Sequence, residues 1–169
     1  NTYVFSPADA TEAQAAWYLS QKTNDKPTSI VLTRQNLPIL ENSSFEKVAK
    51  GAYVVHETSA DFDTILIATG SEVALAIDVA HELEKDGSKV RVVSMPSVEL
   101  FEEQPKEYKE ELLPLSVRRR VSLEMGNSAL WYKYVGLDGL AIGIDKFGAS
   151  APANKVIEEY GFTVEAVVE

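Results

Sequence analysis

One stretch near the middle of the chain shows the clearest hydrophobic pattern. Thr64–Ala68 is a nearly continuous β-branched and apolar run, which is typical of a strand buried on both faces. After Gly70, apolar residues recur at spacings of three and four, which predicts one buried helix face ending near Gly87. These positions are Val73, Ala76, Ile77, Ala80 and Leu83. The next apolar run, Val90–Val93, completes a strand, helix and strand, which predicts a right-handed parallel crossover.

The flanking pattern continues to alternate between strands and helices. Ala52–Glu57 predicts a strand joined to Thr64 by a short connection, which favours antiparallel pairing with that next strand or a place at the sheet edge. Downstream we expect short helices at 98–103, 106–113 and 130–135, strands within 117–124 and 140–144, and two last helices opened by Ser150 and Thr163. The aromatic residues of the 130–135 helix are expected on the sheet edge. Five strands with helices between them predict a three-layer α/β/α domain over roughly residues 46–169.

The first forty-five residues do not complete a layer of their own. Tyr3–Phe5 predicts a strand, and Asp9 with Glu12 resembles a capping box that opens a helix. The apolar stripe of that helix is Ala13, Ala16 and Trp17. Ser29–Thr33 predicts one more strand, and Leu40–Lys50 is interpreted as a linker. Since one helix with so few strands cannot bury both of its faces, this segment is expected to belong to a larger domain.

Composition narrows the class of protein. The chain has no cysteine, which excludes disulfides and thiolate metal sites, and its net charge of −10 argues against nucleic acid or an anionic membrane as a partner. No apolar run reaches membrane-spanning length, and the first residues do not resemble a signal peptide. We therefore expect a cytoplasmic protein. The chain starts without Met and ends inside a predicted helix, so a piece of a longer protein is expected.

Two glycine-containing turns are candidate binding sites. Thr69–Glu72 offers a helix amino end that could hold a phosphate, but it lacks both the further glycines of a dinucleotide fingerprint and a Walker lysine. A capping role for Ser71 is favoured there. Gly136–Gly139 resembles the start of a thiamine diphosphate motif, but Leu137 interrupts it and the paired downstream asparagines are missing. It is interpreted as a turn.

The remaining polar candidates are two histidines, one cluster of arginines and one single arginine. His56 and His81 are isolated in the sequence, and a pairing or solvated role is favoured for both. The cluster Arg118–Arg120 favours local ion pairs over a polyanion site. Arg34 differs because it directly follows a predicted strand, at the end where open parallel sheets place ligands. Ligand binding and pairing with nearby Glu41 remain equal alternatives for Arg34 on these facts.

Several segments, in order along nearly the whole chain, closely resemble transketolase. They are Pro7–Ala13, Leu32–Pro38, Ile67–Val73, Val92–Ser97, Trp131–Leu137, Phe147–Ala153 and Tyr160–Val164. The resemblance is to the carboxy-terminal third of that enzyme. It implies that residues 1–45 are the trailing segment of the pyrimidine-binding domain with its linker, and that residues 46–169 are the complete carboxy-terminal domain. The family domain has a five-stranded mixed sheet whose first strand is antiparallel.

The resemblance also implies a function for the whole protein. Transketolase transfers a two-carbon ketol unit from a ketose phosphate to an aldose phosphate in the pentose phosphate pathway, as a homodimer with thiamine diphosphate and magnesium or calcium. Its cofactor, metal and catalytic residues lie upstream of residue 1, so this chain is expected to bind no cofactor and to be inactive alone. One family substrate residue matches: Arg34, in Thr-Arg-Gln-Asn, corresponds to the arginine that binds the sugar phosphate. Alternatives are a dihydroxyacetone synthase-like relative and an independent small-ligand-binding or regulatory module of this fold.

Overall fold

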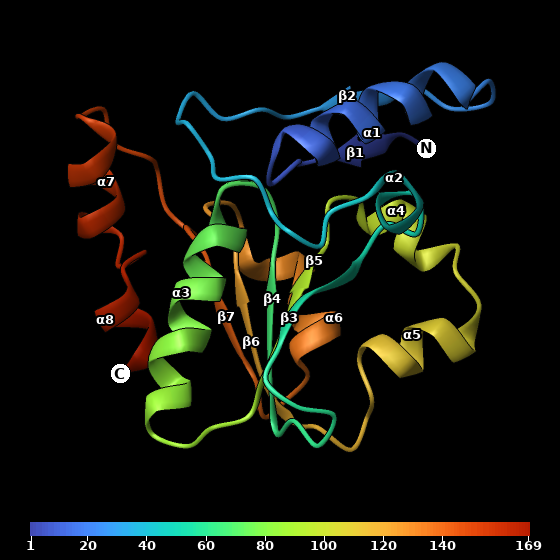
Figure 1. Cartoon of the computed structure of the whole chain (residues 1–169). Coiled ribbons are helices and arrows are strands. Elements are labelled where there is room, and N and C mark those ends of the chain that lie inside the picture. Colours follow the sequence, from blue (N-terminus) through green and yellow to red (C-terminus); the bar gives the residue numbers. More distant parts are fainter.

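The predicted five-stranded mixed sheet is present in the computed structural model, which describes residues 1–169 (Figure 1). Its strands lie in the order β3-β5-β4-β6-β7. They span Tyr53–Glu57 (β3), Thr64–Ala68 (β4), Val90–Ser94 (β5), Arg119–Leu123 (β6) and Leu140–Ile142 (β7). All neighbouring pairs are parallel except β3 with β5. The fold class and the parallel β4–β5 crossover are therefore confirmed.

The position of β3 corrects one prediction and confirms another. This strand lies at the sheet edge and is antiparallel, as expected, but it pairs with β5 and not with β4, the next strand in the chain. The reason is the crossover, which places β5 on one side of β4 and leaves β6 for the other. The free edge of β5 is then the place where β3 can bond.

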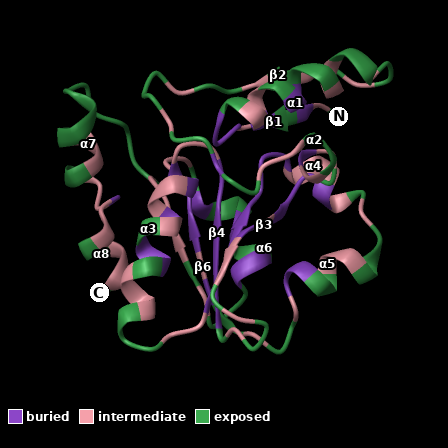
Figure 2. Cartoon of the chain, in the orientation of Figure 1, coloured by how far each residue is buried: buried purple, intermediate pink, exposed green.

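Alternation along β4 divides the core between the two faces of the sheet. All five residues of β4 are buried. Leu66 and Ala68 belong to the cluster that contains α3 (Glu72–Lys85), whereas Ile65 and Ile67 belong to the opposite cluster. Figure 2 shows these central strands buried along most of their length. This arrangement is the three-layer architecture that the sequence predicts.

Each face of the sheet is covered by helices. α3 lies on one face, with α8 (Val164–Val168) against it and α7 (Ala153–Glu159) beyond (Figure 1). The other face carries α4 (Val98–Glu102), α5 (Lys106–Leu112), a 3-10 turn (Ser128–Leu130) and α6 (Tyr132–Val135). None of the helices is both long enough and apolar enough to cross a membrane.

Details of the helices differ from prediction at three places. Trp131 and Tyr134 belong to the buried cluster on the sheet face that also holds Ile65, not to the sheet edge. Ser71 accepts no capping hydrogen bond because its backbone is already helical, and α7 begins after Pro152, so Ser150 is not its cap. The Thr163 cap of α8 is confirmed, since its side chain accepts a hydrogen bond from the Ala166 amide.

The amino-terminal segment forms a small parallel pair of strands with a helix between them. β1 (Tyr3–Phe5) pairs with β2 (Thr28–Ile30), and α1 (Ala10–Lys22) connects them. On α1, Ala15 and Ala16 are buried, whereas Trp17 is 66% exposed, so the predicted apolar stripe is rotated. The expected linker also contains a four-residue helix, α2 (Phe45–Val48), capped by Ser44. A single helical turn is too short to show helical periodicity.

One buried carboxylate joins this segment to the large sheet. Glu12 is fully buried and accepts hydrogen bonds from the Ala8 amide (2.7 Å), the Tyr53 hydroxyl (2.7 Å) and the Ser94 hydroxyl (2.6 Å). Asp9 caps α1 by accepting from the Glu12 amide at 2.7 Å, which confirms half of the predicted capping box. Burial raises the pKa of Glu12, although its three hydrogen-bond donors oppose the rise.

Replacing Glu12 should therefore loosen the contact between the two parts of the chain. Glu12→Ala leaves one amide and two hydroxyls buried without a partner, and we expect a loss on the order of 3 kcal/mol in the free energy of unfolding. Chemical denaturation measures it. Gln14→Ala, on the exposed side of the same helix, is the matched control and should change little. Equal stability of both variants would contradict this role.

Candidate functional site

The carboxyl ends of strands from both sheets meet around one cavity of about 190 Å³. Ser6, Val31, Thr69 and Glu124 each directly follow one of the strands β1, β2, β4 and β6, and all four line it. The Ser6 carbonyl accepts from the Gly70 amide at 2.9 Å, which closes the two sheet ends against each other. In open parallel sheets this is the end at which ligands bind, so the cavity is the first candidate site.

Thr69–Glu72 line one side of this cavity, and backbone amides there already have hydrogen-bond acceptors within the protein. The amides of Gly70, Glu72 and Val73 all donate to backbone carbonyls. The Glu72 carboxylate is 5% exposed and accepts from the Ser71 hydroxyl at 2.6 Å and the Met125 amide at 3.1 Å. Burial raises the pKa of Glu72. A buried carboxylate with occupied amides beside it does not form a phosphate cradle.

Arg34 lies next to this cavity, one residue beyond Thr33, which lines it. Its side chain is exposed and forms neither an ion pair nor a hydrogen bond, so the alternative pairing with Glu41 is not present. The Thr33 hydroxyl accepts from the Gln35 amide at 3.4 Å, which helps to bend the chain at Arg34. The guanidinium is thus free to meet an anion from solvent.

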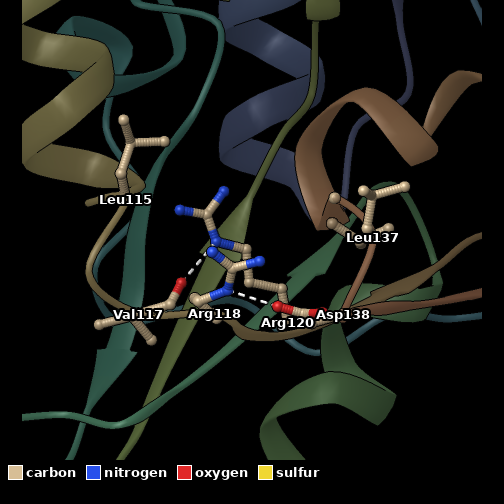
Figure 3. Close-up of a pocket in the computed structure, with 8 residues that line it drawn as sticks. Leu115, Val117, Arg118, Arg120, Leu137 and Asp138 are labelled. Carbon is tan, nitrogen blue, oxygen red and sulfur yellow. Dashed lines mark hydrogen bonds and ion pairs between the residues drawn. The ribbon is translucent and has the colours of Figure 1, made fainter.

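A second cavity, of about 180 Å³, lies at the amino end of β6 (Figure 3). Its lining brings Arg118 and Arg120 together with Gly136–Asp138. Arg118 forms an ion pair with Asp138. Arg120 is 9% exposed and donates to the carbonyls of four residues. Those carbonyls belong to Leu113, Pro114, Val117 and Tyr134.

These contacts confirm the interpretation of Gly136–Gly139 as a turn. The segment connects α6 to β7, and Asp138 is committed to Arg118. A Cβ at Gly139 would lie 2.5 Å from the Val135 carbonyl oxygen, so glycine is required by close backbone packing. The residues here therefore do not fit a thiamine diphosphate site. The ion-pair prediction for the arginine cluster holds for Arg118, whereas Arg120 bonds only to backbone carbonyls.

The two histidines, isolated in the sequence, lie together in the structure. The His56 and His81 rings are perpendicular, with centroids 4.9 Å apart. His56 Nε2 lies 2.6 Å from Glu84 Oε1, so the expected pairing role is confirmed for His56. Glu84 was not singled out from the sequence. The only available signal was its position three residues after His81 on a predicted helix.

The fold and these sites define an α/β domain with a five-stranded mixed sheet covered by helices on both faces. Residues 51–163 match the family described as the Transketolase-like TK C-terminal domain. The match covers most of the chain, and the protein therefore belongs to this family. The fold expectation drawn from the resemblance is confirmed.

Similar proteins agree with this assignment. A probable transketolase of Streptococcus pneumoniae is 64% identical over 169 residues, which is 100% of this chain and 26% of that protein. The transketolase of Bacillus subtilis is 51% identical over 99% of this chain and 26% of its own length. A Pichia stipitis transketolase structure in complex with sedoheptulose 7-phosphate has a TM-score of 0.93 at 40% identity, over 99% of this chain and 24% of that one. The chain thus spans about a quarter of the relatives it matches.

The two arginines beside the second cavity should respond very differently to substitution. Arg120→Ala removes four hydrogen bonds, two of them buried bonds to the carbonyls of Leu113 and Tyr134, and we expect a loss on the order of 3 kcal/mol in unfolding free energy. Arg118→Ala removes an exposed ion pair and should leave stability nearly unchanged. Denaturant titration of both variants measures the difference. Similar losses of unfolding free energy in both variants would show that the buried and the exposed arginine contribute equally to stability.

Proposed function

We propose that the chain is the carboxy-terminal part of a transketolase, which transfers a two-carbon ketol unit from a ketose phosphate to an aldose phosphate. The observation that carries this proposal is the 64% identity along the complete chain to a probable transketolase, together with the family match. We further propose that the whole enzyme is a cytoplasmic homodimer of the pentose phosphate pathway. Thiamine diphosphate and a divalent metal would be held by residues outside this chain.

The proposed division places the end of the pyrimidine-binding domain in residues 1–45 and the carboxy-terminal domain in residues 46–169. Exposed apolar side chains in the first part support it. Trp17, Val31, Leu32 and Ile39 are each more than half exposed. Two parallel strands with one helix are not a stable unit, so these side chains fit a surface that further strands and helices of the same domain would cover.

For Arg34 we propose the role of binding the substrate phosphate. β2 ends at Ile30, so Arg34 lies four residues beyond the strand and does not directly follow it as predicted. Its unpaired guanidinium still supports this role, since the fork of N–H groups can give a phosphate two parallel charge-assisted hydrogen bonds. A similar protein, the Pichia stipitis transketolase, has been solved with a sugar phosphate. Arg34 would bind and orient the phosphorylated end of the substrate, while thiamine diphosphate supplies the carbanion chemistry at the other end.

The alternatives are less well supported. A dihydroxyacetone synthase-like parent is not favoured, because the similar curated proteins are described as transketolases. An independent ligand-binding module is not favoured either, because the similarity extends through the amino-terminal segment of this chain as well as the matched domain.

The isolated chain should neither bind thiamine diphosphate nor transfer ketol units. In the Gly136–Gly139 turn, Gly139 is packed closely against backbone, and the only carboxylate, that of Asp138, is paired with Arg118. Isothermal titration calorimetry with thiamine diphosphate and magnesium checks this expectation. Micromolar binding would instead favour an independent cofactor-binding module.

Losing Arg34 in the full-length enzyme should weaken binding of phosphorylated substrates selectively. Arg34→Ala is expected to cost about 1.5–3 kcal/mol, the usual scale for hydrogen bonds to a charged group. That corresponds to a roughly ten- to hundredfold rise in KM for sugar phosphates. An unphosphorylated ketol donor should be largely unaffected, because it carries no dianion. Steady-state kinetics with both kinds of donor provide the measurement.

Two controls make this experiment specific. Arg34→Lys keeps the charge but loses the fork, so its KM should lie between those of the wild type and Arg34→Ala. Lys22→Ala removes one positive charge from the same segment and should change neither KM. A rise in KM of equal size for phosphorylated and unphosphorylated donors would show that Arg34 is structural.

A further inference from the structure

A cluster of metal-ligating side chains lies between the edge strand β3 and helix α3, away from the carboxyl-end cavity. It consists of His56 on β3 and His81 and Glu84 on α3. One ligand atom from each residue lies within 4.8 Å of the others. Because His81 and Glu84 are three residues apart on a helix, they project from the same face. These are the only histidines in the chain, and the fold places both here.

A β-bulge directs His56 toward this cluster. Along β3 the pairing register with β5 shifts between Val54 and His56. In a regular strand Val55 and His56 would point to opposite faces, but Val55 packs in the α3-side core and His56 also contacts α3. The carbonyl of Val55 accepts a hydrogen bond from the Asn42 side chain at 3.1 Å. Bulges of this kind often re-aim a side chain beside a functional site.

The ligand atoms, all within 4.8 Å of one another, are near enough to close onto a zinc ion. With zinc–ligand bonds of about 2.0–2.2 Å, tetrahedral geometry separates the ligand atoms by about 3.3 Å. His56 Nε2 and Glu84 Oε1, now 2.6 Å apart, would separate slightly as the metal replaces their shared proton. The exposed His81 side chain would move inward.

Hydrogen bonds orient the carboxylate of the cluster. Burial would raise the pKa of Glu84, but hydrogen bonds with His56 and Thr58 outweigh it and hold the pKa below its usual value. The Thr58 hydroxyl donates to Glu84 Oε1 and is itself bonded to the Val90 amide at 3.1 Å. Ordered partners behind a ligand are typical of metal sites, where they fix the ligand geometry.

We propose that His56, His81 and Glu84 bind a divalent transition-metal ion, with Zn²⁺ the best match to two imidazoles and one carboxylate. Three protein ligands leave a fourth position open for water or a small anion. A cavity of about 390 Å³, lined by both histidines and by Asp78, adjoins the cluster and leaves room for that ligand. The bound ion would tie the edge strand to α3, and the site is independent of ketol transfer.

Zinc binding to the 169-residue chain tests this proposal directly. We expect one Zn²⁺ per chain in competition titrations with a chromophoric chelator, a rise in the melting temperature with zinc, and shifts of both imidazole NMR signals. His56→Gln and His81→Gln should each weaken binding roughly tenfold or more. Thr58→Val, which removes only the hydrogen bond behind Glu84, should weaken binding about tenfold as well.

Glu82→Gln is the matched control, because Glu82 is on the same helix and pairs with Lys85 instead of the cluster. It should bind zinc like the wild type. Circular dichroism of each variant distinguishes loss of zinc binding from loss of folding. If His56→Gln does not fold, the test uses His81→Gln, because the His81 side chain is exposed. No zinc binding by the folded chain would overturn the proposal. Undiminished binding in the folded His81→Gln variant would overturn it equally.

Discussion

The two parts of this chain are held together by the buried carboxylate of Glu12. It lies on α1, but two of its three donors, Tyr53 and Ser94, belong to β3 and β5 of the large sheet. A carboxylate without these donors would carry a large desolvation cost, so the position of α1 over the strand ends is tightly specified. The ends of β1 and β2 then meet those of β4 and β6, which creates the cavity beside Arg34.

The proposed functional groups of this chain lie where a sheet ends or is interrupted, not in its regular interior. Arg34 lies beyond the carboxyl end of β2, and its exposed side chain fits the proposed role of binding an anion. His56 occupies the one place where the β3–β5 ladder shifts register. By contrast, Arg120 lies within β6, and its N–H groups donate hydrogen bonds to backbone carbonyls. Residues of the same type therefore differ in role. An arginine whose N–H groups already have acceptors within the fold is structural, whereas one without such acceptors can bind a ligand.

Much of the fold was predictable because its strongest elements carry strong local patterns. Thr64–Ala68 and the 3.6-residue periodicity of α3 predicted the crossover, and Gly87, the expected end of α3, has a positive φ. The prediction failed where the pattern was short or where partners were distant. α2 has only four residues. The predicted apolar stripe of α1 includes Trp17, which is exposed, because an aromatic residue at helical spacing does not reveal which face is covered.

The sequence alone determined the family resemblance, the order of helices and strands, and Arg34 as the candidate substrate residue, since each depends on residues adjacent or regularly spaced in the chain. Only the tertiary structure decided the partner of β3, the burial of Glu12 and the meeting of His56 with His81 and Glu84. The contacts between different elements in these three cases join residues 25 to 82 positions apart. No local propensity encodes such pairings, because packing of the sheet and its bulge creates them.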